Sequence, residues 1–572
     1  MKGKQKQFTL RLHLLFASLV SIGFVLIANL FYIQIKNGQQ LREQADGQYV
    51  VATYNSFERG SIFFEQRDGT RISAAGQKSG YKISVNPKKF SGDKEEVFQT
   101  LSKNLDLDRD NFFATLNKKE RDYVEIAHQV SKTKAQQLKK ELGSHIQLHA
   151  EKWRVYPLHG SAAHVLGFLG FKGDEYAGRY GLERQYGQTL KREDVDLYTN
   201  FFARIFHDVN DLVDSKTVPE GDIVSTIDPQ VQLFFEKELE SVQEKWNSAS
   251  VGGIIMNPQN GEIYSLGAFP SFDNNSFRDY SLNNFKNPLI ENVYEMGSIM
   301  KPLVVAMAID AGDIDSETLE FYDEGFVEVE DYTIKNFDGR GRGWVSVQDI
   351  LNQSLNTGMV YISSKISKKD FRGYFADYGF ASKTGIDLPN EVTGLTSNLK
   401  SNRDIEFANM SFGQGIAVSP IAMTKALSAL SNKGSTVIPH VIKKIEYTNG
   451  FAKTFDYTQD KKTVLKPESS DEISRLLVNV FDNYNNGNWR IPGYSIAAKT
   501  GTAQIPNPTG GYYDDRNLHS FFGYFPAYDP KFIVFLYTVY PKEIKYASQT
   551  LIDPFRNTAK YLINYYNLPP DR

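Results

Sequence analysis

The strongest constraint on the fold is the position of strand-like runs at both ends of the second half of the chain. The run 250–269, "SVGGIIMNPQNGEIYSLGAF", predicts two strands joined at Asn260-Gly261, a dipeptide typical of hairpin turns. Three further β-rich runs occur much later in the chain, at 494–505, 519–529 and 531–540. Between these ends, from Met296 to about Lys433, the pattern is helix-rich. We therefore expect an α+β domain in which helices pack on an antiparallel sheet.

The sequence pattern changes near residue 219, and we expect a domain boundary there. Its 572 residues are too many for one compact core, so several domains are expected. Turn residues there lead into a short strand at 223–227, and Asp228 with Pro229 is typical of a helix N-terminus. We predict that 219–572 forms the α+β domain. The segment 35–218 mixes extended and charged helical runs without a catalytic motif, which favours a pedestal or dimerisation domain.

The N-terminus has the pattern of a membrane anchor. Basic residues occur in 1–11, and a mostly apolar run follows at 12–34. As a helix, that run is long enough to cross a hydrocarbon core of about 30 Å. Because the positive flank comes first, we predict a cytoplasmic N-terminus, a single crossing of the cell membrane and an extracytoplasmic catalytic domain. The alternative is a cleaved signal peptide, whose apolar region would be about 7–15 residues long and followed by an A-x-A-like site.

Composition excludes several classes of function. The formal net charge is −3 at pH 7, without long charged runs. This argues against nucleic acid as a partner, because such binding needs a basic stripe. The chain has no Cys, so a disulfide framework, a zinc ribbon and a thiol nucleophile are excluded.

Three short signatures in the predicted α+β domain carry chemically active side chains. They are Ser298-Ile-Met-Lys301, Ser354-Leu-Asn356 and Lys499-Thr500-Gly501-Thr502. Similar triplets recur elsewhere, for example at 397–400 and 383–385, but only Ser298 precedes a long apolar helix. Only the signature at 499–502 lies in a strand-like run beside other strands. Ser298 lies either inside the apolar helix or in the turn before it, and a solvated helix end is the alternative to a catalytic pair.

A serine hydroxyl needs a base before it can act as a nucleophile. The chain has no G-x-S-x-G elbow and no His near Ser298, which leaves Lys301, one turn away on the same face. An ordinary Lys has a pKa of about 10.4, so roughly one in 2,500 is neutral at pH 7. Burial and a nearby cation would lower that pKa, and we therefore predict that Lys499 approaches this pair across a cleft. Ser354 would relay a proton to the leaving amine, and Asn356 would hold Lys301 and the substrate amide.

The third signature suits recognition of a substrate. Thr500 and Thr502 offer hydroxyls to a substrate carboxylate, and Gly501 lets the strand approach the ligand closely. The backbone N–H groups of Ser298 and Thr502 would form an oxyanion hole.

With these signatures the chain resembles a monofunctional class B penicillin-binding protein, a peptidoglycan D,D-transpeptidase. The resemblance covers nearly the whole chain. The similar stretches are "RGSIFFEQRDGTRISA" at 59–74, "RVYPLHGSAAHVLGFLG" at 154–170, "GRYGLERQYGQTL" at 178–190 and "FANMSFGQGIAVSPIAMTKALSALSNKG" at 407–434. Arg154, Gly167, Gly181 and Glu183 match positions that organise the pedestal in this family. One departure is Ala498, where the family often has Gly, and its methyl group is expected to narrow the cleft slightly.

The resemblance implies that Ser298 attacks the penultimate D-Ala carbonyl of a stem pentapeptide and releases the terminal D-Ala. The acyl-enzyme would then pass to an amine on a neighbouring peptidoglycan stem peptide, and β-lactam antibiotics would acylate Ser298 as substrate mimics. No metal or other cofactor is implied. The implied partners are a membrane glycan polymerase, a cell-wall synthesis complex and a second copy of the chain. The sequence "SLNTGM", with Asn356, favours the division type over the elongation type.

Two rival functions share these signatures. A β-lactamase or D,D-carboxypeptidase would form the same acyl-enzyme, but rapid deacylation usually needs an added general base, which we do not identify. A non-catalytic penicillin-binding scaffold is the other alternative. The presence of all three signatures argues against it.

Overall fold

The computed structural model describes residues 21, 23, 58–172, 175–192 and 218–572. The predicted tail and anchor at 1–34 lie outside the described residues, apart from 21 and 23. Within the described part of the chain, no helix is both long enough and apolar enough to cross a membrane.

The chain forms two compact units. In the described residues, the small unit consists of Ser21, Gly23, Glu58 and Lys78–Trp153, and the large unit of the described parts of Arg59–Gln77 and Arg154–Arg572. The domain limit predicted between residues 218 and 219 stays a prediction.

The small unit packs three helices against paired strands. Its helices are α2 (Lys94–Ser102), α3 (Arg109–Leu116) and α4 (Lys132–Leu142). The later part of β2 (Arg71–Val85) pairs antiparallel with β3 (Val124–Ser131), with Gly80 opposite Ser131. Ser131 also caps α4, because its hydroxyl accepts a hydrogen bond from the Lys134 N–H. Ile83, Leu101 and Leu138 belong to the core that these elements share.

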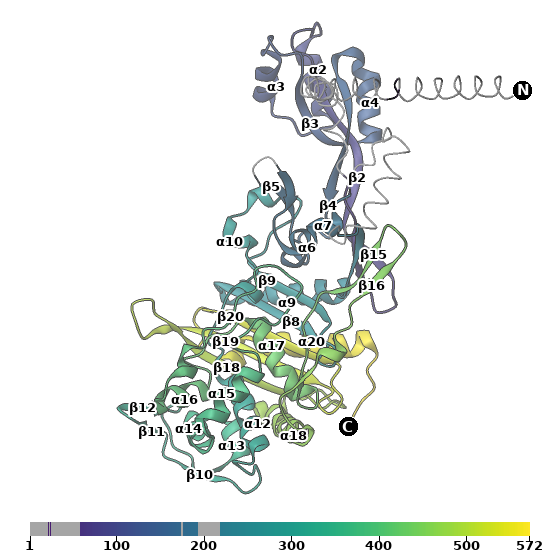
Figure 1. Ribbon diagram of the computed structural model, residues 1–572. Helices are drawn as coiled ribbons and strands as arrows, with labels where there is room; N and C mark the ends of the chain where they lie inside the picture. The colour runs from purple at the N-terminus through teal and green to yellow at the C-terminus, as the bar shows by residue number, and fades with distance from the viewer. Residues whose placement is uncertain (1–20, 22, 24–57, 173–174, 193–217) are drawn as a thin grey trace, which may run out of the picture. The chain divides into compact units, whose positions relative to one another are not determined.

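The large unit is built on a five-stranded antiparallel sheet, which confirms the predicted α+β class (Figure 1). In spatial order its strands are β18 (Ala497–Pro506), β19 (Tyr512–Phe525), β20 (Phe532–Val539), β8 (Ser250–Met256) and β9 (Ile263–Phe269). Val534 faces Ile255 across the β20–β8 pair, so the latest strands join the earliest ones at the centre of the sheet. Asn260-Gly261 lies in the loop between β8 and β9, where Gly261 has a φ of 88°.

Helices cover both faces of this sheet. One face packs on α9 (Pro229–Trp246) and α20 (Ile552–Tyr566), through a core that contains Phe235, Phe521 and Phe555. The other face packs on a layer that contains α12 (Lys301–Ala311), α17 (Pro420–Ser428) and α18 (Pro467–Asn483). The predicted cap of α9 is present, since Asp228 accepts hydrogen bonds from the N–H groups of Gln230 and Val231.

The middle of the chain differs from the helix-rich prediction. Two short ribbons interrupt the helices: β10 (Glu320–Asp323) pairs with β13 (Gly343–Ser346), and β11 (Phe326–Val329) pairs with β12 (Tyr332–Lys335). The physical reason is a two-residue alternation of apolar and polar side chains in "FVEVEDYTIK", 326–335, which suits strands. The helices α13 (Val347–Asn352) and α14 (Asn356–Lys365) follow.

Residues from the N-terminal half complete the large unit. β1 (Ile62–Glu65) runs parallel to β7 (Gly221–Ser225), which pairs with β15 (Ile442–Tyr447). Close by, the buried Glu183 carboxylate accepts hydrogen bonds of 2.6 Å from both Arg59 and Arg154. Burial alone would raise the pKa of Glu183, but the two guanidinium groups lower it below the ordinary value.

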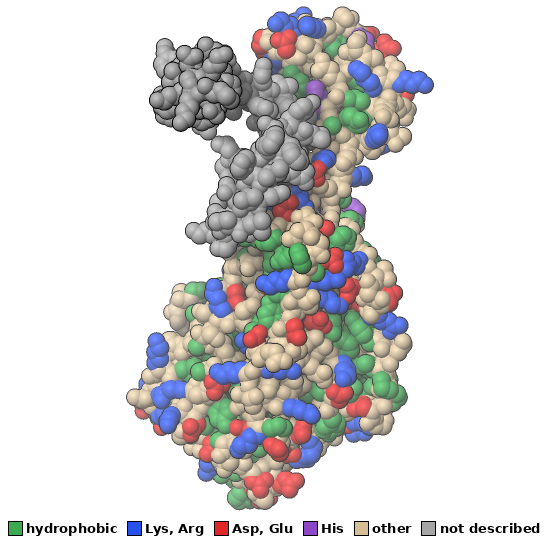
Figure 2. Space-filling view, turned by 45° about the vertical axis from the view of Figure 1, so that its right-hand side comes forward, with side chains coloured by type: hydrophobic (Ala, Val, Ile, Leu, Met, Phe, Trp, Pro, Cys, Tyr) green, Lys and Arg blue, Asp and Glu red, His purple; other side chains and the backbone are tan. Residues whose placement is uncertain are grey.

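Charge is mixed on the surface of the large unit. On the face in Figure 2, basic and acidic side chains are interspersed over the lower part of the molecule, without a continuous basic stripe on that face.

Candidate active site

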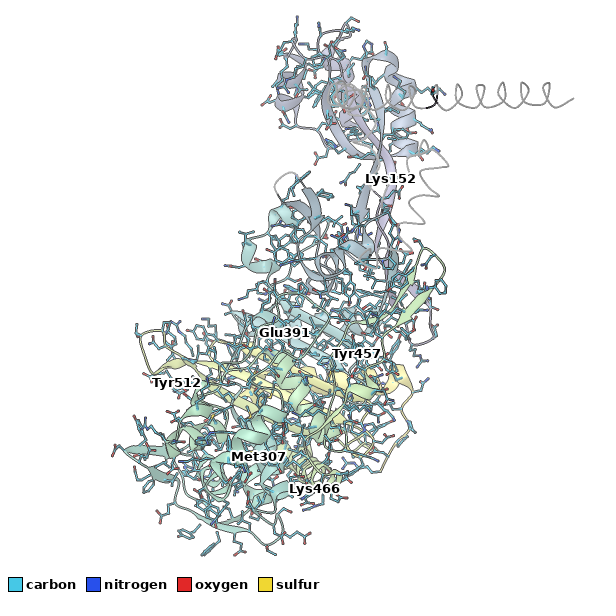
Figure 3. The ribbon with its side chains drawn as sticks, in the orientation of Figure 1. Lys152, Met307, Glu391, Tyr457, Lys466 and Tyr512 are labelled. Atoms are coloured by element: carbon cyan, nitrogen blue, oxygen red, sulfur yellow. The ribbon has the colours of Figure 1, made fainter. Side chains whose placement is uncertain are left out.

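Ser298 lies in a turn directly before the apolar helix. The turn Gly297–Met300 is a 3-10 helix, and α12 begins at Lys301. Ser298 is half-buried, whereas Lys301 is fully buried. Met296, Met300 and Met307 are buried, and Figure 3 shows Met307 among the helices of the large unit.

Ser354 occupies the position where α13 ends. Its φ of 53° places it in the left-handed region, one residue beyond the helical cap Gln353. The Ser354 N–H donates to the Leu351 carbonyl and the Leu355 N–H to the Ile350 carbonyl. These two bonds form a Schellman motif, in which this position is usually Gly. The chain then turns at once into α14, which starts at Asn356.

The second signature surrounds the amine of Lys301. The Lys301 Nζ donates to the Ser354 carbonyl at 2.6 Å, to Asn356 Oδ1 at 2.8 Å and to Ser354 Oγ at 3.3 Å. Burial lowers the pKa of Lys301 well below its ordinary value, and the positive charge of Lys499 lowers it further.

Lys499 reaches the same hydroxyl from strand β18. Its Nζ donates to Ser354 Oγ and to the Thr500 carbonyl, both at 3.1 Å. Lys499 is fully buried, and burial lowers its pKa to about 7. Ser354 Oγ therefore lies between two amines whose proton affinity is much reduced, an arrangement suited to proton transfer.

Two glycines bring the Ser298 turn against β18. Gly297 has a φ of 63°, and a Cβ there would lie 2.8 Å from the Thr502 carbonyl oxygen. A Cβ at Gly501 would lie 2.6 Å from the Met296 carbonyl oxygen. That same oxygen accepts a hydrogen bond of 2.7 Å from the Ser520 hydroxyl on β19, which ties the turn to the sheet.

These segments meet at a cavity of about 870 Å³. Of the predicted site residues, the lining includes Ser298, Ser354, Asn356, Thr500 and Thr502. The Thr500 hydroxyl is hydrogen-bonded to the Tyr484 hydroxyl at 2.7 Å, and the Thr502 hydroxyl accepts from the Ala547 N–H at 3.2 Å. The competing K-T-G at 383–385 lies in a loop, where Lys383 is exposed.

The expectation for Ala498 is not met. Its methyl group belongs to the core between the sheet and α20, beside Phe555, and so points away from the cavity. Gly523 faces Ala498 on β19, and a Cβ at Gly523 would lie 3.1 Å from that methyl group. The absence of a side chain on the neighbouring strand thus makes room for Ala498 without narrowing the cleft.

Sequence reasoning missed several residues at this site. Tyr484 and Ser520 make the contacts described above, but neither lies in a signature. Ser520 is in the strand-like run that pairs with the third signature, and that pairing was the available signal. Tyr484 directly follows α18 and begins the 3-10 helix Tyr484–Gly487, which is too short for periodicity to carry information.

Comparison with known proteins identifies the family. Residues 251–558, more than half of the chain, match the family described as the penicillin binding protein transpeptidase domain. Residues 56–194 match the penicillin-binding protein dimerisation domain. This chain belongs to the class B penicillin-binding proteins.

Relatives of this penicillin-binding protein align over most of their length. Stage V sporulation protein D of Bacillus subtilis is 30% identical over 547 residues, which cover 93% of this chain and 82% of that protein. A protein of Mesostigma viride named peptidoglycan D,D-transpeptidase FtsI homolog is 26% identical, covering 96% of this chain and 94% of its own.

Solved structures share the fold of this penicillin-binding protein. Penicillin binding protein 2X from Streptococcus thermophilus has a TM-score of 0.70 at 21% identity, covering 90% of this chain and 80% of that one. Penicillin binding protein 3 from Mycobacterium tuberculosis, solved with aztreonam, has a TM-score of 0.68 at 20% identity. The alignment covers 91% of this chain and 98% of that one.

Proposed function

We propose that this penicillin-binding protein is a serine-type D,D-transpeptidase that cross-links peptidoglycan stem peptides. The observation that carries the proposal is the meeting of Ser298, Ser354 and Thr502 at one cavity, with Lys301 and Lys499 both hydrogen-bonded to Ser354 Oγ. The names of relatives as peptidoglycan D,D-transpeptidases support the same reaction.

In the acylation step, neutral Lys301 takes the proton of the Ser298 hydroxyl while Oγ attacks the penultimate D-Ala carbonyl carbon. The bond from that carbon to the terminal D-Ala nitrogen then breaks. Ser354, which accepts hydrogen bonds from both lysines, gives its hydroxyl proton to the leaving amine and takes in exchange the proton that Lys301 removed from Ser298, so Lys301 becomes neutral again. The N–H groups of Ser298 and Thr502 stabilise the oxyanion.

Asn356 serves both the base and the substrate. Its Nδ2 donates to the Lys335 carbonyl at 3.1 Å, which engages one of the two N–H groups at this end of the amide. Its Oδ1 accepts from Lys301 and, as a carbonyl oxygen, has a second lone pair for a substrate N–H. The hydroxyls of Thr500 and Thr502 receive the terminal carboxylate of the stem peptide.

In the second step, an amine of a neighbouring stem peptide attacks the acyl-enzyme and receives the acyl group, which regenerates the Ser298 hydroxyl. β-Lactams acylate Ser298 in the same way, but their ring nitrogen stays attached to the acyl group. Structures of penicillin binding protein 3 with aztreonam and with ampicillin support β-lactams as ligands of this fold.

A fluorescent penicillin tests the proposal. We expect covalent labelling of the unaltered protein, none for Ser298→Ala, and at least a 100-fold slower acylation for Lys301→Ala, because general base catalysis is typically worth about 10²–10⁴ in rate. Labelling is measured by gel fluorescence after denaturation, and the labelled peptide is identified by mass spectrometry.

Lys383→Ala is the matched control, since Lys383 belongs to the exposed K-T-G copy. It should label like the unaltered protein. Label that stays on Ser298→Ala would overturn the nucleophile, and release of the adduct within seconds would favour a β-lactamase.

The cellular setting is part of the same proposal. The apolar run 12–34 would anchor the protein in the cell membrane with its catalytic domain outside, beside a membrane glycan polymerase and a second copy of the chain. Asn356 supports a role in division. Imaging a tagged copy at mid-cell or along the side wall distinguishes the division type from the elongation type.

A further inference from the structure

A second layer of polar side chains lies next to the second signature. Asp323 ends β10, Asn336 follows β12, and Thr357 is in the first turn of α14. All three are buried, with exposed fractions of 1%, 4% and 0%, and none of them is among the residues that line the cavity. We call them the Asp323 cluster.

Hydrogen bonds within the Asp323 cluster converge on one carboxylate. Asp323 Oδ1 accepts from the Thr357 hydroxyl at 2.7 Å, from the Gly325 N–H at 2.9 Å and from Asn336 Nδ2 at 3.0 Å. Asn336 Oδ1 accepts from the Thr357 N–H at 3.3 Å. A buried carboxylate is costly unless donors surround it, so these bonds hold the three side chains in one arrangement.

This arrangement holds in place the donor and the acceptor of the hydrogen bond between Asn356 and Lys335, which orients the Asn356 side chain. Thr357 is the residue after Asn356, and Asn336 is the residue after Lys335, whose carbonyl accepts from Asn356 Nδ2. An Asn amide has one donor end and one acceptor end. With Nδ2 held at the Lys335 carbonyl, Oδ1 is the end that faces Lys301, at 2.8 Å.

The Asp323 cluster also holds the loop 338–344, "DGRGRGW", through hydrogen bonds. This loop has no role in the proposed reaction. Asn336 Nδ2 donates to the Arg340 carbonyl at 3.2 Å, and the Arg342 N–H donates to the Asp323 carbonyl at 3.0 Å. The glycines allow this compact loop, since a Cβ at Gly341 would lie 2.8 Å from the Asp323 carbonyl oxygen. The loop is therefore part of the support of the site.

We propose that Asp323, Asn336 and Thr357 are positioning residues, which act through Asn356 to present an acceptor to Lys301 during acylation. The inference rests on the proposed function. A shift of about 1 Å in a supporting group can cost about 100-fold in rate, so the cluster should affect the chemical step more than ligand binding.

Thr357→Val tests this inference, because valine keeps the shape of the side chain but lacks the hydroxyl that donates a hydrogen bond to Asp323. Stopped-flow acylation by a fluorescent penicillin separates the dissociation constant of the first complex from the acylation rate constant. We expect the rate constant to fall by about 10- to 100-fold and the dissociation constant to change by less than about 3-fold. Thr357→Ser, which keeps the hydroxyl, should restore the rate.

Thr558→Val is the matched control. Thr558 is equally buried, and its hydroxyl donates at 2.8 Å to the Pro554 carbonyl in α20, on the other side of the sheet. It should lose similar thermal stability and acylate at the unaltered rate. Thr357→Ala carries the same test if Thr357→Val does not fold.

The outcomes separate the inference from the proposed function. If the unaltered protein is labelled at Ser298 but Thr357→Val acylates equally fast, the positioning role is wrong and the transpeptidase proposal stands. Equal rate losses in the Thr357 and Thr558 variants would also overturn the positioning role. No labelling of the unaltered protein would overturn the proposed function itself.

Discussion

At the scale of single residues, Ser354 combines two conflicting demands. The end of α13 requires the left-handed backbone conformation at Ser354. In that conformation a residue with a side chain is less stable than Gly by roughly 1–2 kcal/mol. At the same position, Lys301 and Lys499 both donate hydrogen bonds to the hydroxyl of Ser354. A serine there indicates that local stability is given up for the proton path, as is common at functional sites.

Two substitutions of Ser354 should separate these demands. Ser354→Gly and Ser354→Ala both remove the hydroxyl, and both should slow acylation by penicillin by at least about 100-fold. Only Gly relieves the backbone conformation, so the Gly variant should exceed the Ala variant by about 1 kcal/mol in free energy of unfolding. Stopped-flow acylation and urea denaturation measure the two effects. Equal stability of the variants would contradict the conformational argument.

At the scale of elements, the site depends on how closely the Ser298 turn approaches β18. Gly501→Ala would place a methyl group against the Met296 carbonyl oxygen and the Ser520 hydroxyl. Backbone atoms cannot move aside cheaply, so we expect a loss of about 1–3 kcal/mol in free energy of unfolding, together with slower acylation. Both are measured on the purified protein by urea denaturation and penicillin labelling.

Gly373→Ala serves as the control for Gly501→Ala. Gly373 lies in α15 (Lys368–Asp377), and a Cβ there would have no heavy atom within 4 Å. Ala should stabilise this helix by up to about 1 kcal/mol without affecting acylation. A Gly501→Ala protein that behaves like this control would show that the turn and the strand are not tightly packed.

Elements with a regular pattern could be predicted from the sequence, and elements without one could not. The central sheet follows from β-rich runs and the Asn260-Gly261 turn, and the cap of α9 follows from Asp228 before Pro229. The signatures identified the residues around the cavity because chemistry restricts which types can occupy those positions. The Asp323 cluster was not predictable, since Asp323 and Asn336 come from short ribbons, and only the folded chain brings them to Thr357.

At the scale of the whole molecule, a buried carboxyl makes the stability of the large unit depend on pH. Asp387 accepts hydrogen bonds of 2.8 Å from the N–H groups of Val441 and Ile442, at the start of β15. Burial raises the pKa of this carboxyl to about 7 despite those donors. An unfolded Asp has a pKa of about 3.9. Between about pH 4 and 7 the folded chain therefore holds a proton that the unfolded chain has lost.

The sign of the effect follows from this difference. The contribution of Asp387 is fully present below about pH 4 and is lost as pH rises through 7, because the folded state binds more protons in that window. Relative to Asp387→Asn, the free energy of unfolding should fall by a few kcal/mol across this window and then level off. Urea denaturation at a series of pH values measures it. A difference that is constant with pH would show that the carboxyl is already ionised at pH 4.

The central place of β20 in the sheet has a consequence for when the protein can become active. β20 comes from the last part of the chain, yet it separates β19 from β8, which comes from near residue 250. A nascent chain that already carries the serine, both lysines and most helices would still lack the middle of its scaffold. Catalytic competence should therefore be acquired only after the residues of β20, Phe532–Val539, have been synthesised and have paired with β8.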